Sequence, residues 1–174
     1  MSGHSHWKQI QHKKGAADKK RGVKFTKLLK AIQIAARNET NPDFNPTLKD
    51  AIRRAKEGNV PNDTIERAIT KSSEVKNLKE VVFEAYGPGG AALIIEAITD
   101  NNNRTVSELK RLLSDYKAKL ADPGSVLWAF EKKDGAWHAG FMQSIEEKDK
   151  QLLIKLIEAL NDHDDVQQIT TNGK

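Results

Sequence analysis

The chain has 174 residues, of which 37% are hydrophobic and 30% are charged, which is the composition of a globular protein of one or two small domains. It has no cysteine, so disulfides, thiolate metal sites and cysteine nucleophiles are excluded. Its net charge of +5 is unevenly spread, because residues 1–79 hold 18 Lys and Arg against 8 Asp and Glu, whereas residues 80–174 hold 11 against 16. This asymmetry indicates a polyanionic partner for the first part, although a merely solvated basic surface is the alternative.

The first 37 residues are the most basic, with ten Lys and Arg and one acid, Asp18. Residues 1–12 show no clean period, and we interpret them as an arm tethered by Trp7 and Ile10. Residues 13–24 are basic and small, which fits an exposed helix or an ordered loop. No stretch resembles a secretory signal or spans a bilayer, so we expect a cytoplasmic protein without a membrane partner.

Three helices are predicted next. Apolar residues at helical spacing begin at Phe25 and continue until a break over 38–46. Asn45-Pro46 begins a second helix that Gly58-Asn59 ends, and Pro61 opens a third. Their apolar stripes predict a small three-helix bundle, so residues 1–74 are expected to form a basic helical domain with an arm.

After a polar linker at 72–79 the period changes to that of strands and helices. Strands are predicted over 81–86, 91–98, 125–131, 136–141 and 166–170, and helices behind Thr105 and over 146–160. Thr105 to Glu108 has the spacing of a capping box, and Val126, Trp128 and Phe130 alternate as one face of a strand. Residues 80–174 are therefore expected to form an α/β sandwich with one mostly antiparallel sheet and both helices on one face. The fold class is α+β.

The order of several motifs resembles the YebC family. These motifs are Gly3-His4-Ser5, Trp7, His12-Lys13, Asp18, Lys20-Arg21, residues 25–28, Asn45-Pro46, Ala51-Ile52, Ala55, residues 61–69, residues 86–90, 99–101 and 103–105, Gly124-Ser125-Val126, residues 156–160 and residues 164–167. The resemblance implies a regulator of gene expression. Family members are labelled probable transcriptional regulators, mitochondrial relatives look like translational activators of cytochrome oxidase subunits, and the family is understood to act on the ribosome at difficult sequences such as proline runs.

Two departures from the family pattern are visible. Members usually carry a third small domain where this chain has only a short connection at about 134–145, so we expect a shortened form. Whatever that third domain does, including part of a ribosome contact, is in doubt here. His6 stands where the family usually has lysine, which lowers the charge of the arm by about one.

The candidate site is nucleic-acid binding. Several cations along one surface suit a phosphate backbone, and in a helix Lys13, Lys20, Lys24 and Lys27 share one face. Aromatic rings could stack on unpaired bases, although for Trp7 alone packing on the bundle is the favoured alternative. The predicted residues are His4, Trp7, His12, Lys13, Lys14, Lys19, Lys20, Arg21, Lys24, Lys27 and Arg104.

Three other features have competing interpretations. Arg104 follows a polar loop at a helix start, where it could bind an anion or simply pair with Asp100. His4, His6 and His12 lack the spacing and carboxylates of a metal site, and His4 is better interpreted as a polar contact to RNA. Residues 87–90 lack the Lys-Ser/Thr ending of a phosphate loop and fit a turn between two strands.

No spacing indicates a catalytic group, so no enzyme, cofactor or small-molecule substrate is expected. The preferred function is a ribosome-associated translation factor or activator that binds rRNA. A DNA-binding transcriptional regulator is the alternative, and a protein-interaction module is the third. The oligomeric state stays open.

Overall fold

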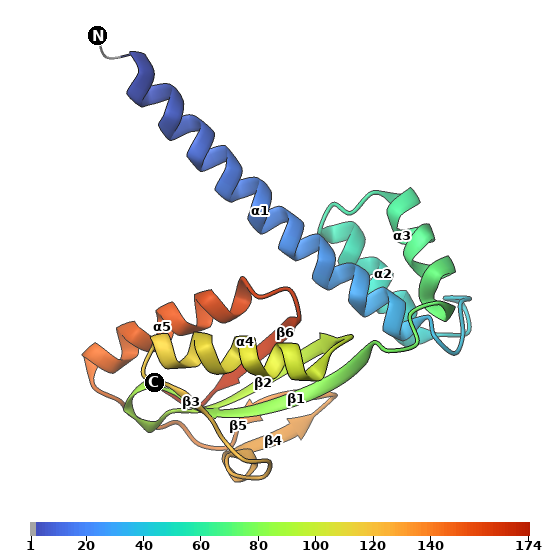
Figure 1. Cartoon of the computed structure of the whole chain (residues 1–174). Coiled ribbons are helices and arrows are strands. Elements are labelled where there is room, and N and C mark those ends of the chain that lie inside the picture. The colour runs from blue at the N-terminus through green and yellow to red at the C-terminus, as the bar shows by residue number, and fades with distance from the viewer. Residues whose placement is uncertain (1–2) are drawn as a thin grey trace. The chain divides into compact units, whose positions relative to one another are not determined.

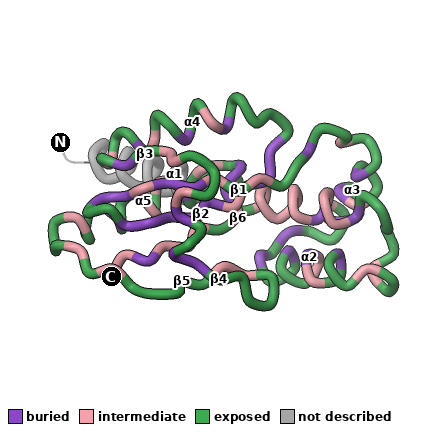
Figure 2. The backbone as a smooth tube through the Cα atoms, turned by 90° about the horizontal axis from the view of Figure 1, so that it is seen from below, coloured by how far each residue is buried: buried purple, intermediate pink, exposed green. Residues whose placement is uncertain are grey.

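The structure is a computed structural model that describes residues 3–174, with side chains from residue 17 onward. The chain divides into two compact units, Met1–Val75 and Lys76–Lys174, here called unit 1 and unit 2 (Figure 1). Each unit has its own buried core, which is visible as separate purple stretches of the backbone in Figure 2. No helix in the described part of the chain combines the length and apolarity that a bilayer span requires.

Unit 1 consists of three helices, α1 (Gly3–Ala35), α2 (Pro46–Glu57) and α3 (Asn62–Thr70), followed by a short 3-10 turn, Lys71–Ser73. The predicted second and third helices are confirmed. The arm expected over residues 1–12 is wrong for the described backbone, because one continuous helix begins at Gly3. Residues 1–12 combine the good helix formers Lys and Gln with Ser, His and Gly, which favour helix less, so neither apolar period nor propensity predicts a helix here.

Both ends of α2 are closed by local hydrogen bonds. The Asn45 side chain accepts the backbone N–H of Leu48 at 3.0 Å, and Pro46 occupies the first turn, where its missing N–H costs nothing. At the other end, the N–H groups of Asn59 and Val60 bond back to Lys56 and Ala55. This is a Schellman ending, and the left-handed residue in it is Asn59, with φ of 61°.

Gly58 allows α2 to end against α1. A Cβ on Gly58 would lie 2.5 Å from Cδ1 of Leu28, which is closer than real Cβ contacts come. The two helices approach over a core whose fully buried members are Ile32, Ala36, Leu48 and Ala55, with Ala51, Val60, Ile65 and Ala68 nearly so. Burying apolar area of this kind is what holds three short helices together.

Unit 2 is built on a four-stranded antiparallel sheet of order β3-β1-β2-β6. Its strands are β1 (Lys79–Tyr86), β2 (Ala92–Thr99), β3 (Lys119–Leu120) and β6 (Val166–Thr171). The turn predicted at residues 87–90 joins β1 to β2, with Phe83 opposite Ile95 in the register. β2 is nearly all buried because it is central and covered on both faces.

Two helices, α4 (Asn102–Asp115) and α5 (Glu147–Asn161), cover one face of this sheet, as predicted (Figure 1). Leu109 and Leu113 from α4 and Leu156 and Leu160 from α5 are fully buried against the strands. The opposite face is covered by a second, two-stranded sheet, β4 (Phe130–Lys133) and β5 (Ala136–Ala139). The expectation of a single sheet is therefore corrected to two.

The strand predicted over 125–131 is also wrong in its first half. Leu127–Ala129 form a 3-10 turn, and β4 begins only at Phe130. Val126 is fully buried, whereas Trp128 is 70% exposed and stacks on Phe141 with ring centroids 5.4 Å apart. Alternation in the sequence therefore did not correspond to one face of a strand.

The buried carboxylate of Glu84, on β1, explains this turn. It accepts the backbone N–H groups of Gly124 at 2.6 Å, Val126 at 2.7 Å and Leu127 at 3.2 Å. These donors are then unavailable for strand pairing, so the loop curls around the carboxylate.

The capping box predicted at Thr105 is wrong. The helix cap lies four residues earlier, at Asn101, whose side chain accepts the N–H of Arg104 at 3.1 Å. Thr105 is a buried helical residue whose hydroxyl lies 2.6 Å from the carboxylate of Asp165. The Thr105 hydroxyl therefore bonds a residue 60 positions away in the sequence, and the spacing of neighbouring residues gives no sign of that bond.

Candidate nucleic-acid interface

The predicted site residues fall into three groups. The side chains of His4, Trp7, His12, Lys13 and Lys14 lie outside the described residues. Lys19, Lys20, Arg21, Lys24 and Lys27 lie on α1 in unit 1. Arg104 lies on α4 in unit 2, so it is treated apart from the α1 residues.

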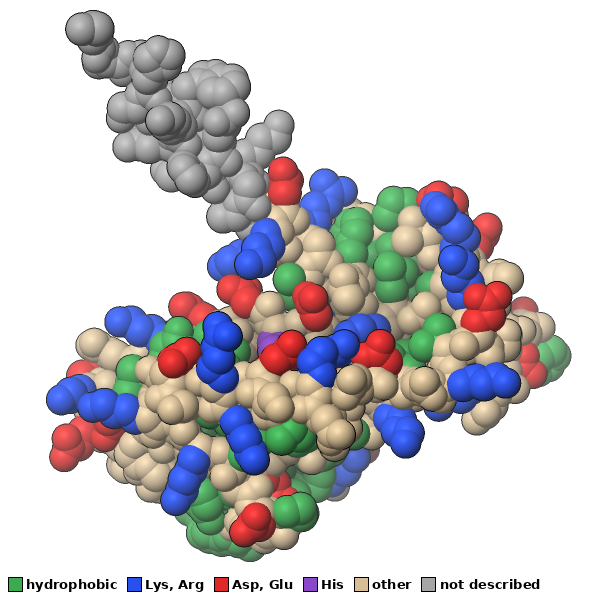
Figure 3. Space-filling model, viewed as in Figure 1, with side chains coloured by type: hydrophobic (Ala, Val, Ile, Leu, Met, Phe, Trp, Pro, Cys, Tyr) green, Lys and Arg blue, Asp and Glu red, His purple; other side chains and the backbone are tan. Residues whose placement is uncertain are grey.

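The α1 residues are brought together by helical periodicity. Lys20, Lys24 and Lys27 are spaced four and three residues apart, so they project from one face of the helix. Lys19, Lys20, Arg21 and Lys24 are exposed, and Lys27 is half-buried. Figure 3 shows Lys and Arg side chains on both sides of the helix at the point where its described residues begin.

Four exposed cations of α1 differ from the arginines of α2 and α3 in their partners. Arg53 and Arg54 pair with Asp50, and Arg67 pairs with Asp63, each within its own helix. By contrast, among residues with described side chains no carboxylate lies within ion-pair distance of the four exposed cations Lys19, Lys20, Arg21 and Lys24. We call these four residues the basic segment. Their charge is not neutralised within the described part of unit 1, which leaves it available to a polyanion.

A groove lies beside the basic segment. It has a volume of about 520 Å³ and is lined by Lys20, Arg21, Lys24, Phe25, Gly58 and Asn59. The α1 residues form one side, and the end of α2 forms the other. Its size falls in the range of small-ligand sites.

One wall of the groove is a stacked pair. The guanidinium carbon of Arg21 lies 5.1 Å from the centre of the Phe25 ring, which is a cation–π distance. Phe25 is half-buried, so its ring contributes both to the core of unit 1 and to the groove. On the facing side Asn59 is exposed, and within the described part of the chain no hydrogen bond to its side chain is found.

Sequence reasoning missed three of these lining residues. Phe25 was interpreted only as the start of an apolar stripe, and Gly58-Asn59 only as a helix ending. Both interpretations are correct locally, but the groove arises from the packing of α2 on α1, which brings residues 20–25 next to residues 58–59. An arginine four residues before an aromatic ring on a helix was the one available signal.

Arg104 is surrounded by acids. Its guanidinium lies 3.0 Å from Asp100, 2.9 Å from the buried Asp165 and 3.8 Å from Glu108. The hydrogen bond to Asp165 is the main reason that the pKa of Arg104 is raised above its ordinary value. This arrangement favours the structural alternative, in which Arg104 ties α4 to the α5–β6 loop. A contact between Arg104 and nucleic acid stays a prediction.

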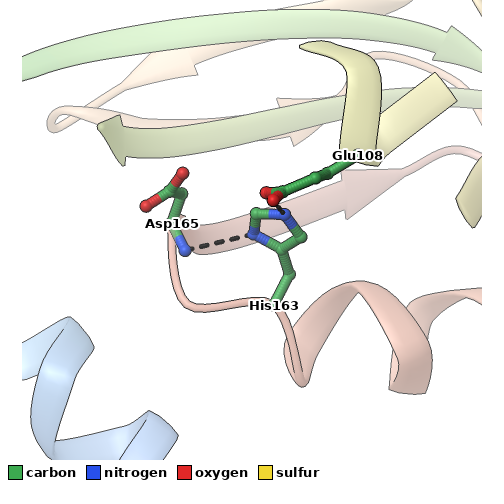
Figure 4. A group of neighbouring side chains, drawn as sticks. All are labelled: Glu108, His163 and Asp165. Atoms are coloured by element: carbon green, nitrogen blue, oxygen red, sulfur yellow. Dashed lines mark hydrogen bonds and ion pairs between the residues drawn. The ribbon is translucent and has the colours of Figure 1, made fainter. Parts of the chain in front are cut away.

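A cluster of Glu108, His163 and Asp165 adjoins Arg104, and its potential ligand atoms lie within 4.8 Å of one another. In Figure 4 the His163 ring lies between the Asp165 backbone nitrogen and the Glu108 carboxylate. Nδ1 of His163 accepts that N–H at 3.1 Å, so the proton of the neutral ring is on Nε2, which lies 3.0 Å from Glu108. With both ring nitrogens and the Asp165 carboxylate engaged by protein groups, we interpret the cluster as an ion-pair network that closes the α5–β6 loop.

Two family comparisons cover most of the chain. The family described as "TACO1/YebC protein N-terminal domain" matches residues 5–75, and that described as "TACO1/YebC second and third domain" matches residues 78–137. The chain belongs to the TACO1/YebC family. The resemblance to YebC proteins seen in the sequence is thereby confirmed.

Individual relatives agree with this assignment. A probable transcriptional regulatory protein of Desulfosudis oleivorans is 51% identical over 137 residues, which cover 76% of this chain and 56% of that protein. Another, of Solibacter usitatus, is 49% identical over 136 residues, covering 76% and 55%. The crystal structure of a conserved hypothetical protein, Aq1575 from Aquifex aeolicus, matches with a TM-score of 0.81 and 29% identity over 88% of this chain and 90% of that one. The mixed helical and antiparallel-sheet fold class is thus confirmed.

The chain spans little more than half the length of the probable transcriptional regulators that it matches. The match to the second and third TACO1/YebC domains ends at residue 137, inside the connection at 134–145 where we expect the third domain to be missing. That absence stays a prediction, and so does the domain division at residues 74 and 80.

Proposed function

We propose that this TACO1/YebC protein is a nucleic-acid-binding regulator of gene expression, and that it binds ribosomal RNA on the ribosome through the basic segment of α1. One observation carries the proposal: Lys19, Lys20, Arg21 and Lys24 are exposed without carboxylate partners in the described part of unit 1, whereas the arginines of α2 and α3 are paired. Each lysine or arginine that contacts a phosphate releases counterions, so an unpaired set of this kind favours a polyanion.

The proposed mechanism is binding without bond making or breaking. Unit 1 holds the RNA, and unit 2 positions the protein and contacts protein or tRNA. The proposal includes a cytoplasmic location and requires no enzyme activity, cofactor, small-molecule substrate or membrane contact. We propose that the remaining predicted residues near the N-terminus, His4, Trp7, His12, Lys13 and Lys14, extend the same RNA contact.

DNA binding is the second candidate, because the relatives from Desulfosudis oleivorans and Solibacter usitatus are named probable transcriptional regulatory proteins. The α1 cations would serve a duplex backbone as well as RNA, since phosphate contacts carry no sequence information. Competition between a duplex DNA and a structured rRNA fragment of equal length distinguishes the two candidates.

The proposal is tested by sedimenting a cell lysate through a sucrose gradient at low and at moderate salt. The protein is followed beside the ribosomal subunits, together with a Lys19→Ala/Lys20→Ala/Arg21→Ala variant. A matched control, Lys49→Ala/Lys56→Ala/Lys71→Ala, removes the same charge from exposed positions elsewhere in unit 1. We expect the wild type and the control to travel with ribosomal subunits and the α1 variant to stay at the top. A wild type that stays at the top at both salts would refute ribosome binding.

A further inference from the structure

The groove beside the basic segment is lined by an aromatic ring and an amide as well as by cations. A site that only attracted phosphates would need cations along a surface. This groove also presents an aromatic ring, a guanidinium over that ring and an amide side chain without a described partner, all within one hollow of about 520 Å³. Together these groups provide a stacking surface and a hydrogen-bonding edge.

We propose that the groove binds one unpaired nucleotide of a single-stranded RNA segment, with its base inside the groove. This inference rests on the proposed function, because it assumes that the basic segment binds nucleic acid. Lys20 and Lys24 contact the flanking phosphates, the base stacks against the Arg21–Phe25 pair, and the Asn59 carboxamide meets the edge of the base.

The Arg21–Phe25 pair is a suitable surface for a base to stack on. Arginine guanidinium planes and aromatic rings are the surfaces on which proteins stack unpaired bases. The Arg21 guanidinium lies over the Phe25 ring at a cation–π distance, a contact that favours this position of the side chain before a base arrives. Phe25 in turn is fixed by its packing on the core of unit 1. An ordered stacking surface loses less conformational entropy on binding than a free side chain.

Asn59 provides the second argument. It occupies a left-handed position, φ 61°, at which glycine is ordinarily preferred, because glycine has no Cβ to strain. Its side chain is exposed, and among the described residues it makes no hydrogen bond, so the helix ending itself does not require the carboxamide. A carboxamide offers both a donor and an acceptor, which matches the edge of a base.

The groove predicts a preference for bases over bare phosphates, and this can be measured. The probe is a fluorescein-labelled single strand of twelve uridines, compared by anisotropy with an abasic strand of the same length and charge. The test variant is Arg21→Lys/Asn59→Gly in the full chain. It retains the net charge and the left-handed backbone position but lacks the guanidinium plane and the amide. Lys49→Ala is the control, with one exposed cation removed from α2 outside the groove.

We expect the wild type to bind the uridine strand about tenfold more tightly than the abasic strand, as base stacking of ordinary strength gives. The double variant should lose most of that difference between the two strands, and Lys49→Ala should retain it. Equal wild-type affinity for both strands, or a preference that the double variant keeps, would overturn the groove proposal and leave nucleic-acid binding intact. If the wild type binds neither strand, both the groove proposal and the proposed function fail.

Discussion

Replacing Glu84 with glutamine should destabilise unit 2 through a loop that lies about 40 residues away in sequence. One carboxylate oxygen accepts the N–H of Gly124, and the other accepts those of Val126 and Leu127. The side-chain oxygen of a glutamine can still accept the N–H groups of Val126 and Leu127. Its NH₂ group then faces the N–H of Gly124, and two donors cannot form a hydrogen bond with each other.

The cost follows from those three bonds. Leaving the Gly124 donor unsatisfied in a partly buried site costs about 1–3 kcal/mol, and each remaining bond loses its charge assistance, about 1 kcal/mol. The free energy of unfolding should therefore fall by roughly 3–5 kcal/mol, which for a unit of about this size lowers Tm by more than about 10 °C.

Urea unfolding followed by tryptophan emission measures this effect, since Trp128 and Trp137 both lie in unit 2 close to the loop. Glu80→Gln is the control, because it makes the same substitution at an exposed position of the same strand and should change stability by less than about 0.5 kcal/mol. A loss below about 1 kcal/mol for Glu84→Gln would refute the reasoning that this carboxylate organises the loop.

Two further predictions concern a titrating carboxyl group and a close helix contact. Burial raises the pKa of Glu96 above its ordinary 4.5, so the folded state binds more protons than the unfolded state and stability falls as pH rises through the raised value. Glu96→Gln should remove this contribution to the fall in Tm as pH rises above about 4.5, and an unchanged pH profile would contradict this. Gly58→Ala should lower stability by about 1 kcal/mol, measured by circular dichroism in urea, because the end of the Leu28 side chain must move to make room for the added methyl. The cost should shrink in a Leu28→Ala background, and an equal cost in both backgrounds would show that the overlap is not its cause.

Regular elements could be predicted from the sequence because their signals are local. Asn45-Pro46 and Gly58-Asn59 close α2 by hydrogen bonds within a few residues, and the apolar period of α5 needs no partner to be recognised. The same is true of the turn between β1 and β2. Each of these elements could be predicted because the contacts that form it lie within a few residues of one another in the sequence.

Two of the errors in unit 2 share one physical cause, which is a polar group whose partner lies far along the chain. Thr105 was taken for a cap, but its hydroxyl bonds Asp165. The strand expected around Trp128 was displaced by the Glu84 carboxylate. The candidate groove likewise depends on residues 20–25 meeting residues 58–59, so charge patterning predicted the basic segment of α1 but not the stacking wall beside it.

The central claim is that the basic segment of α1 binds RNA phosphates, and the salt dependence of binding tests it most directly. Affinity for an unpaired rRNA fragment would be measured from about 50 to 200 mM NaCl for the wild type and for a variant with Lys19, Lys20, Arg21 and Lys24 all changed to alanine. The logarithm of the binding constant should fall steeply with the logarithm of salt for the wild type. The slope of the variant should be shallower by roughly 0.7 for each phosphate that it no longer neutralises, about 3 in all. Equal slopes for the two proteins, or a wild-type affinity that salt does not change, would contradict the claim.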